Sequence, residues 1–155
     1  MKDITFVFSV VLMLVLGIDS LDQAIEKLSL SAATQAGHQL PGFYSSHQAA
    51  LASASEDDRP IVLVFGRSGD LATEDFKNQV LRSSNVQSVK EHFIWAFIDI
   101  EQSVHQETAK RFHIKSTPSV CVVDRTGREL TRLSGSTPAH ALIGRLAVCL
   151  RHKKA

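Results

Sequence analysis

The sequence predicts one α/β domain built on a layered sheet, following a short N-terminal export segment. Short apolar segments typical of strands alternate with segments of helical periodicity, and the last two strands are close enough to form a hairpin. The chain has 155 residues, of which 44% are hydrophobic and 21% charged, which suits one packed core and excludes a disordered or coiled-coil chain. The expected order is α-β-α-β-α-β-β-α, with right-handed crossovers between the parallel strands.

Residues 1–20 are predicted to form a secretory signal peptide. Their apolar run covers 6–18 and is shorter than the ~20 residues that a membrane-spanning helix needs. Cleavage after Ser20 or Ala24 satisfies the small-residue rule only loosely, so a buried helix and an uncleaved membrane anchor stay open as alternatives. Export to a periplasmic or extracellular space is therefore expected, with membrane anchoring through this segment as the alternative. Residues 21–40 are expected to form a short helix and a linker.

The main domain is predicted over residues 41–150 and begins with a helix and a central strand. Ser46 can cap a helix that starts with residues 47–52, because a serine side chain accepts a hydrogen bond from the free N–H groups of the first turn. The apolar run 61–65, bounded by a proline and a glycine, is typical of a strand buried on both faces.

Helical and strand patterns then alternate through the middle of the domain. Apolar residues at helical spacing over 71–81 predict one helix, and Asn85 is placed to cap a second, shorter one. The aromatic and β-branched run 93–100 predicts the next strand, and Ser103 is placed to cap a helix that extends to Phe112.

The C-terminal part predicts a β-hairpin and a final helix. Two strands, 119–123 and 129–133, flank the turn 124–127, whose glycine supplies a positive φ. A helix opened by a Thr-Pro pair follows over 137–150, and residues 151–155 are expected to form a solvated basic tail.

Composition excludes several classes of function. With 17 basic and 16 acidic residues, the chain lacks the positive charge that nucleic-acid binding requires, so no nucleic-acid partner is expected. The two cysteines, Cys121 and Cys149, and the seven histidines show no spacing typical of a metal site, so neither a metal nor a cofactor is expected. A disulfide between Cys121 and Cys149 stays open, since an exported protein lies in an oxidising compartment.

Four segments together resemble the thioredoxin family, in particular the thioredoxin-like domains of exported thiol:disulfide interchange proteins. They are the strand "IVLVF", the strand end "FIDIE", the segment "AKRFHIKSTPSV" and the hairpin "VVDRTGREL", within a match over 44–150. The resemblance implies a thioredoxin-like three-layer fold, a central mixed sheet with helices on both faces and a C-terminal β-hairpin plus helix. It also implies a cis peptide bond between Thr117 and Pro118, beside the site that is redox-active in the family.

The redox dithiol of the family is absent. The resemblance places Asp70 and Thr73 at the positions of the two redox cysteines, Val64 at that of a buried acid, and Gly69 at that of an aromatic residue. The helix N-terminus that stabilises a thiolate can also hold a carboxylate, so Asp70 is interpreted first as an N-cap. The alternative interpretation is that Asp70 presents its charge to a ligand.

These observations predict a binding module without redox activity rather than an enzyme. The module is expected to hold a protein or an extended peptide in a groove beside the predicted cis-proline. The residues expected to line that groove are Arg67, Ser68, Gly69, Asp70, Thr117 and Pro118. One alternative is a thiol-disulfide oxidoreductase or reductase that acts through Cys121 alone, and another is an accessory domain of a membrane-associated complex. The oligomeric state does not follow from the sequence.

Overall fold

The computed structural model describes residues 40–153, which lie in the second of the two units, Met1–Gln39 and Leu40–Ala155, into which the chain divides. The predicted signal peptide and nearly all of the predicted helix and linker lie outside the described residues. Within residues 40–153, a four-stranded sheet has the order β2-β1-β3-β4. Its strands are β1 Ile61–Gly66, β2 Ile94–Asp99, β3 Ser119–Val123 and β4 Glu129–Ser134.

The sheet is mixed, as expected. β1 pairs with β2 in parallel, while β3 pairs with both β1 and β4 in antiparallel register. The β3–β4 turn has the predicted glycine at a positive φ, Gly127 at 82°. Its geometry is set by Asp124, whose Oδ1 accepts hydrogen bonds from Thr126 N and Arg128 N at 2.9 and 3.0 Å.

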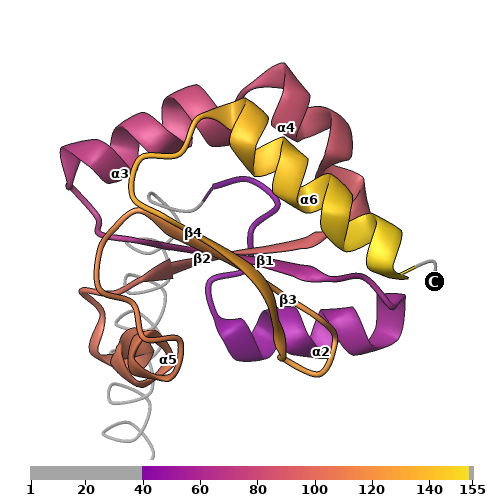
Figure 1. Cartoon of the computed structure of the whole chain (residues 1–155). Helices are drawn as coiled ribbons and strands as arrows, with labels where there is room; N and C mark the ends of the chain where they lie inside the picture. Colours follow the sequence, from indigo (N-terminus) through magenta and orange to yellow (C-terminus); the bar gives the residue numbers. More distant parts are fainter. Residues whose placement is uncertain (1–39, 154–155) are drawn as a thin grey trace, which may run out of the picture. The chain divides into compact units, whose positions relative to one another are not determined.

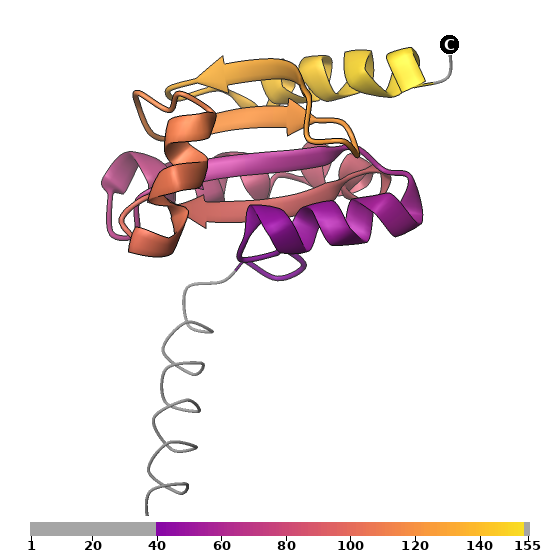
Figure 2. The ribbon, with the colours of Figure 1, turned by 90° about the horizontal axis from the view of Figure 1, so that it is seen from below.

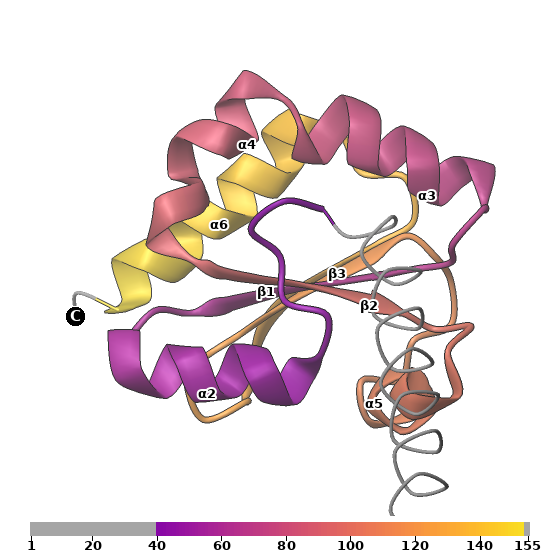
Figure 3. The same cartoon turned by 180° about the vertical axis from the view of Figure 1, so that it is seen from behind.

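Helices cover both faces of the sheet (Figure 1). One face carries α2 His47–Asp57 and α5 Gln106–Arg111, which lie in front of the sheet in Figure 2. The other carries α3 Leu71–Asp75, its π-helical continuation η1 Phe76–Leu81, α4 Ser84–Val89 and α6 Ala139–Lys153 (Figure 3). Two single 3₁₀ turns, η2 Lys90–His92 and η3 Ser103–His105, complete the described elements. No helix among the described residues is long and apolar enough to cross a bilayer.

The strict alternation of side chains along β1 divides the core into two clusters. Ile61, Leu63 and Phe65 pack on the side of α2, whereas Val62 and Val64 pack on the side of α6. All five are 0% exposed, which confirms the prediction of a strand buried on both faces.

The same alternation separates the two cysteines. Cys121 faces Leu63 across the β1–β3 ladder and belongs to the cluster on the α2 side. Cys149 projects from α6 into the cluster on the opposite side of the sheet, and both thiols are free and buried. The considered Cys121–Cys149 disulfide is therefore wrong, because the sheet lies between the two side chains.

Two predicted helix caps are also wrong. Asn85 lies inside α4, and Ser83, which has the extended backbone that an N-cap requires, accepts a hydrogen bond from Val86 N at 3.4 Å. Ser103 opens the 3₁₀ turn η3 and does not cap α5, which continues directly from that turn. Ser46 caps α2 as predicted, with its Oγ accepting from Ala49 N at 3.2 Å.

The predicted basic tail begins within the last helix. α6 continues to Lys153, so residues 151–153 form its final turn instead of following it. The Arg151 side chain is favourable at this position because a helix carries partial negative charge at its C-terminus.

Candidate functional site

Three segments that are distant in the sequence meet at one end of the sheet. Phe65 pairs with Ser119, so the chain leaves β1 beside Pro118, and Ile100 N donates to Gly66 O at 3.0 Å after β2. The Thr117–Pro118 peptide bond is cis. Of the residues predicted to line the groove, Arg67, Ser68 and Gly69 are exposed, Asp70 and Thr117 are half-buried, and Pro118 is buried. We call the part of this end formed by these six residues the Pro118 surface.

Asp70 caps α3, as predicted. Its Oδ2 accepts hydrogen bonds from Thr73 N at 3.0 Å and from Thr73 Oγ1 at 2.9 Å. Thr73 Oγ1 in turn accepts from Arg67 N at 3.2 Å, and the Thr73 side chain is 1% exposed. The side chains of the two residues predicted to stand at the cysteine positions are thus joined by a hydrogen bond. No residue within the described part of the chain donates to Asp70 Oδ1, so this oxygen is the one that a ligand could use.

Asp99 holds the loop after β1 in place. The residue is 6% exposed, and its carboxylate accepts hydrogen bonds from Ser68 Oγ at 2.5 Å, Ser68 N at 3.4 Å and Glu101 N at 3.1 Å. Burial opposes ionisation of this group, but the hydrogen bonds from Ser68, Glu101 and Gln102 outweigh it and lower the pKa of Asp99. An ion pair between Arg67 Nε and Glu101 Oε1 at 3.2 Å joins the same two loops on the outside.

The main chain of Thr117 is available for pairing. In the described part of the chain, its N–H and C=O make no hydrogen bond, whereas the next carbonyl, Pro118 O, accepts from Gly135 N at 2.9 Å. Thr117 is half-buried, and it precedes β3 at the end of the sheet where the chain leaves β1 toward Asp70. Unpaired main-chain groups of this kind can add an extended strand from another chain.

The model of the family described as "Thioredoxin-like domain" matches residues 47–147. The chain belongs to this family. Three solved structures are similar to it in fold. A "DsbH Oxidoreductase" is 20% identical with a TM-score of 0.61, covering 74% of this chain and 91% of its own. A thioredoxin from Thermus thermophilus is 24% identical with a TM-score of 0.62, covering 72% and 90%.

The third structure is a disulphide isomerase from Xylella fastidiosa Temecula1, 20% identical with a TM-score of 0.56, covering 73% of this chain and 98% of its own. At these identities, the likeness establishes the three-layer thioredoxin-like fold and no more. A search of curated proteins finds no match to the chain.

The thioredoxin-like domain keeps its thiols away from the Pro118 surface. Cys121 is 0% exposed, and burial raises its pKa to about 12, so the thiol stays protonated at neutral pH. Burial also raises the pKa of Cys149. Since the thiolate is the reactive form, these surroundings disfavour thiol chemistry at either residue. No cluster of three metal-ligating side chains occurs among residues 40–153.

The residues beneath Asp70 and Thr73 are apolar or closely packed. Val64, at the position of a buried acid in redox-active members, lies in the core. A side chain at Gly66 would place its Cβ 2.5 Å from Thr73 Cγ2 and 2.9 Å from Phe97 Cζ. Only glycine therefore lets α3 pack this closely on the end of β1.

Sequence reasoning brought together Asp70, Thr73, Thr117 and Pro118 but missed Asp99. Asp99 falls within the strand predicted over 93–100, and an acid inside such an apolar run is a signal for a hydrogen-bonded role. Sequence reasoning also missed Lys77, which is buried in η1 with its Nζ 2.8 Å from Glu74 Oε1 and 4.3 Å from the centre of the Phe97 ring.

Proposed function

We propose that this protein is an exported thioredoxin-like binding module without thiol-disulfide activity, which holds an extended segment of a partner protein on the Pro118 surface. The observation that carries the proposal is that the main-chain N–H and C=O of Thr117 have no partner among residues 40–153. They lie near the loop in which Asp70 and Thr73 are predicted to replace the two redox cysteines. Thiol-disulfide exchange needs a thiolate, and neither residue can supply one. Export is inferred from the predicted signal peptide at residues 1–20.

Two exposed apolar side chains support a protein partner. Leu71 is 77% exposed at the first position of α3, directly after Asp70, and Val104 is 75% exposed in the turn that follows β2. The loops that carry them are tied together by the Ser68–Asp99 hydrogen bonds. Apolar side chains fixed next to unpaired main-chain groups suit an extended segment that pairs through its backbone and inserts apolar residues at its sides.

The test measures both activity and binding. The protein is first assayed for reduction of insulin by dithiothreitol, where we expect a rate equal to that of dithiothreitol alone. A faster rate that is lost in Cys121→Ser would support the one-cysteine oxidoreductase and contradict the proposal.

The second part uses the tagged protein to capture partners from the envelope fraction of the source cells. The amount of partner captured by the wild type is compared with the amounts captured by Leu71→Ser and Pro118→Ala. Removing a buried Leu side chain from an interface costs about 1.5–3 kcal/mol, so we expect partner affinity to fall at least tenfold in Leu71→Ser. Because Leu71 is so exposed, this variant keeps its fold even if Pro118→Ala does not. Leu130→Ser, which removes a half-exposed leucine from β4, is the matched control and should bind normally. Equal capture by all variants would exclude the Pro118 surface.

A further inference from the structure

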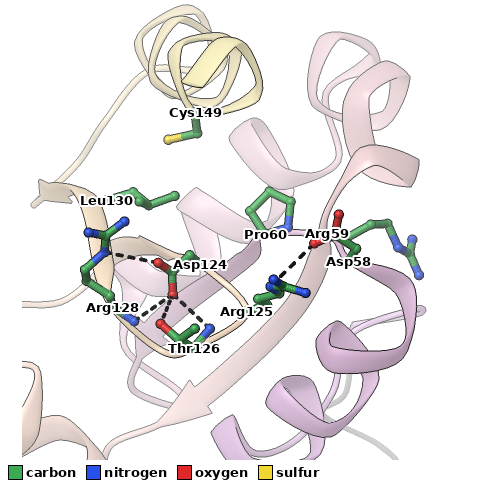
Figure 4. A pocket seen from close by; sticks show the side chains of 9 residues that line it. All are labelled: Asp58, Arg59, Pro60, Asp124, Arg125, Thr126, Arg128, Leu130 and Cys149. Atoms are coloured by element: carbon green, nitrogen blue, oxygen red, sulfur yellow. Dashed lines mark hydrogen bonds and ion pairs between the residues drawn. The ribbon is translucent and has the colours of Figure 1, made fainter. Parts of the chain in front are cut away.

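A second concave site lies at the opposite end of the sheet from the Pro118 surface. Ile61 begins β1 and pairs with Val123 at the end of β3, so the segment before β1 and the β3–β4 turn come together there. With the C-terminal part of α6 they enclose a pocket of about 370 Å³, drawn in Figure 4. This volume lies at the small end of the range for ligand pockets, ≈ 300–1,000 Å³.

Apolar groups from three elements line part of this pocket. Pro60 contributes from the start of β1, Leu130 from β4 and Cys149 from α6. In Figure 4 the sulfur of Cys149 projects from the helix toward the side of the pocket where Leu130 lies. Leu130 is one of the few large apolar side chains that the described residues expose, at 39%. An apolar body in the pocket would cover it.

The charged groups of the lining favour an anion. Three arginines and two aspartates line the pocket, but Arg59 is paired with Asp57 and donates to Glu91 O at 3.0 Å. The cations left for a ligand are therefore Arg125 and Arg128. The hairpin itself uses the carboxylate of Asp124, which accepts from Thr126 N and Oγ1 and from Arg128 N and Nε at 2.6–3.1 Å. Its negative charge is thereby largely neutralised within the turn.

The arginines keep donors for a ligand. Asp124 engages only the Nε of Arg128, and the terminal amino groups of this exposed side chain have no partner within the described residues. Arg125 Nε forms an ion pair with Asp58 Oδ1 at 3.7 Å, which is too long for a hydrogen bond, so the N–H donors of Arg125 are not used by Asp58. In Figure 4, Arg128 lies on the side of the pocket where Asp124 and Leu130 are, and Arg125 lies nearer the middle, next to Asp58. A planar guanidinium is well suited to bind a carboxylate through two parallel hydrogen bonds.

We propose that this pocket binds a small organic acid, with the apolar body of the acid against Pro60, Leu130 and Cys149 and its carboxylate on Arg125 and Arg128. The site is independent of the proposed peptide-binding surface, since the two lie at opposite ends of β1 and β3.

The probe for this site is 4-phenylbutyrate, an aromatic ring on a short aliphatic acid, titrated into the isotope-labelled full chain and followed by amide chemical shifts. We expect saturable shifts at Leu130, Cys149 and the β3–β4 turn. The uncharged 4-phenylbutanamide should bind the wild type about tenfold more weakly than the acid does. The acid should also bind about tenfold more weakly to Arg125→Gln and to Arg128→Gln, because each of these three changes removes a charge-assisted hydrogen bond. Arg67→Gln, at the other end of the sheet, is the matched control and should bind as the wild type.

Alkylation gives a second readout that needs no variant. We expect bound 4-phenylbutyrate to slow the reaction of Cys149 with N-ethylmaleimide, measured by peptide mass spectrometry, and to leave the slower reaction of Cys121 unchanged. Equal binding of the acid and the amide, shifts that gather away from the pocket, or no saturable shift at millimolar probe would each overturn the proposal.

Discussion

The contact between Asp70 and Thr73 makes a quantitative prediction about stability. Asp70→Ala removes the acceptor of both Thr73 N and Thr73 Oγ1. Loss of an N-cap costs about 1 kcal/mol, and the Thr73 hydroxyl, in a side chain 1% exposed, loses its acceptor at a cost of about 1 kcal/mol more. The expected loss in free energy of unfolding is therefore about 2 kcal/mol. For a domain of this size, it corresponds to a fall in Tm of about 8 °C.

Two further variants separate capping from charge. Asp70→Asn keeps an oxygen that can accept the same hydrogen bonds, so its loss should stay below about 0.5 kcal/mol. Asp75→Ala removes an exposed acid of the same helix that makes no side-chain cap hydrogen bond, and it should leave stability almost unchanged. Urea unfolding, followed by the fluorescence of Trp95, the single tryptophan, measures all three.

The interpretation of Asp70 as a structural cap would be refuted if Asp70→Ala lost no more stability than Asp75→Ala. If Asp70→Asn lost as much as Asp70→Ala, the stabilising factor would be charge at the helix N-terminus. If Asp70→Asn kept its stability but bound the captured partner more weakly, the carboxylate would have the second role considered for it, presenting charge to a ligand.

Three further outcomes are expected. Gly66→Ala should lower the free energy of unfolding by about 1–3 kcal/mol, measured by urea denaturation, because its Cβ would come within 2.5 Å of the buried Thr73 side chain. Stability equal to that of the wild type would show that the packing here relaxes freely. Burial and, secondarily, the Arg111 cation lower the pKa of His47 below 6.5, so the unfolded chain binds the proton more readily and stability falls as the pH drops below that value. His47→Leu should flatten this fall between about pH 7 and pH 5 and raise stability at neutral pH, since the Nε2 of His47 is buried with no hydrogen-bond partner among residues 40–153. An unchanged pH profile would contradict this. Finally, the double variant Asp70→Cys, Thr73→Cys should catalyse the reduction of insulin by dithiothreitol, because the side chains at these two positions already meet at 2.9 Å. A folded variant that has a free dithiol but no activity would show that the surrounding apolar residues also block the chemistry.

Much of the fold followed from local patterns. The run 61–65 became β1, the Thr126-Gly127 turn formed the hairpin, and Ser46 capped α2, because each of these depends on residues within a few positions of one another. The errors were also local. Asn85 and Ser83 are both good capping residues two positions apart, and only the point at which η1 ends decides which of them begins α4.

The missed parts of the site depend on contacts across the fold. Asp99 reaches Ser68 from 31 positions away, and Lys77 is buried only because η1 packs on the Phe97 side of β2. The hydrophobic periodicity of the sequence does not predict such contacts. They exist because elements that are distant in the chain pack against each other in the folded domain.

The two cysteines separate what the sequence determines from what only the tertiary structure determines. Their scarcity, together with Asp70 and Thr73 at the positions of the family dithiol, could be read from the chain alone, since it concerns only which residue stands where. Whether Cys121 and Cys149 could pair depended on which face of the sheet each one occupies. The alternation of β3 directs Cys121 toward α2, while the packing of α6 on the other face directs Cys149 to the far side of the sheet and into the lining of a second pocket.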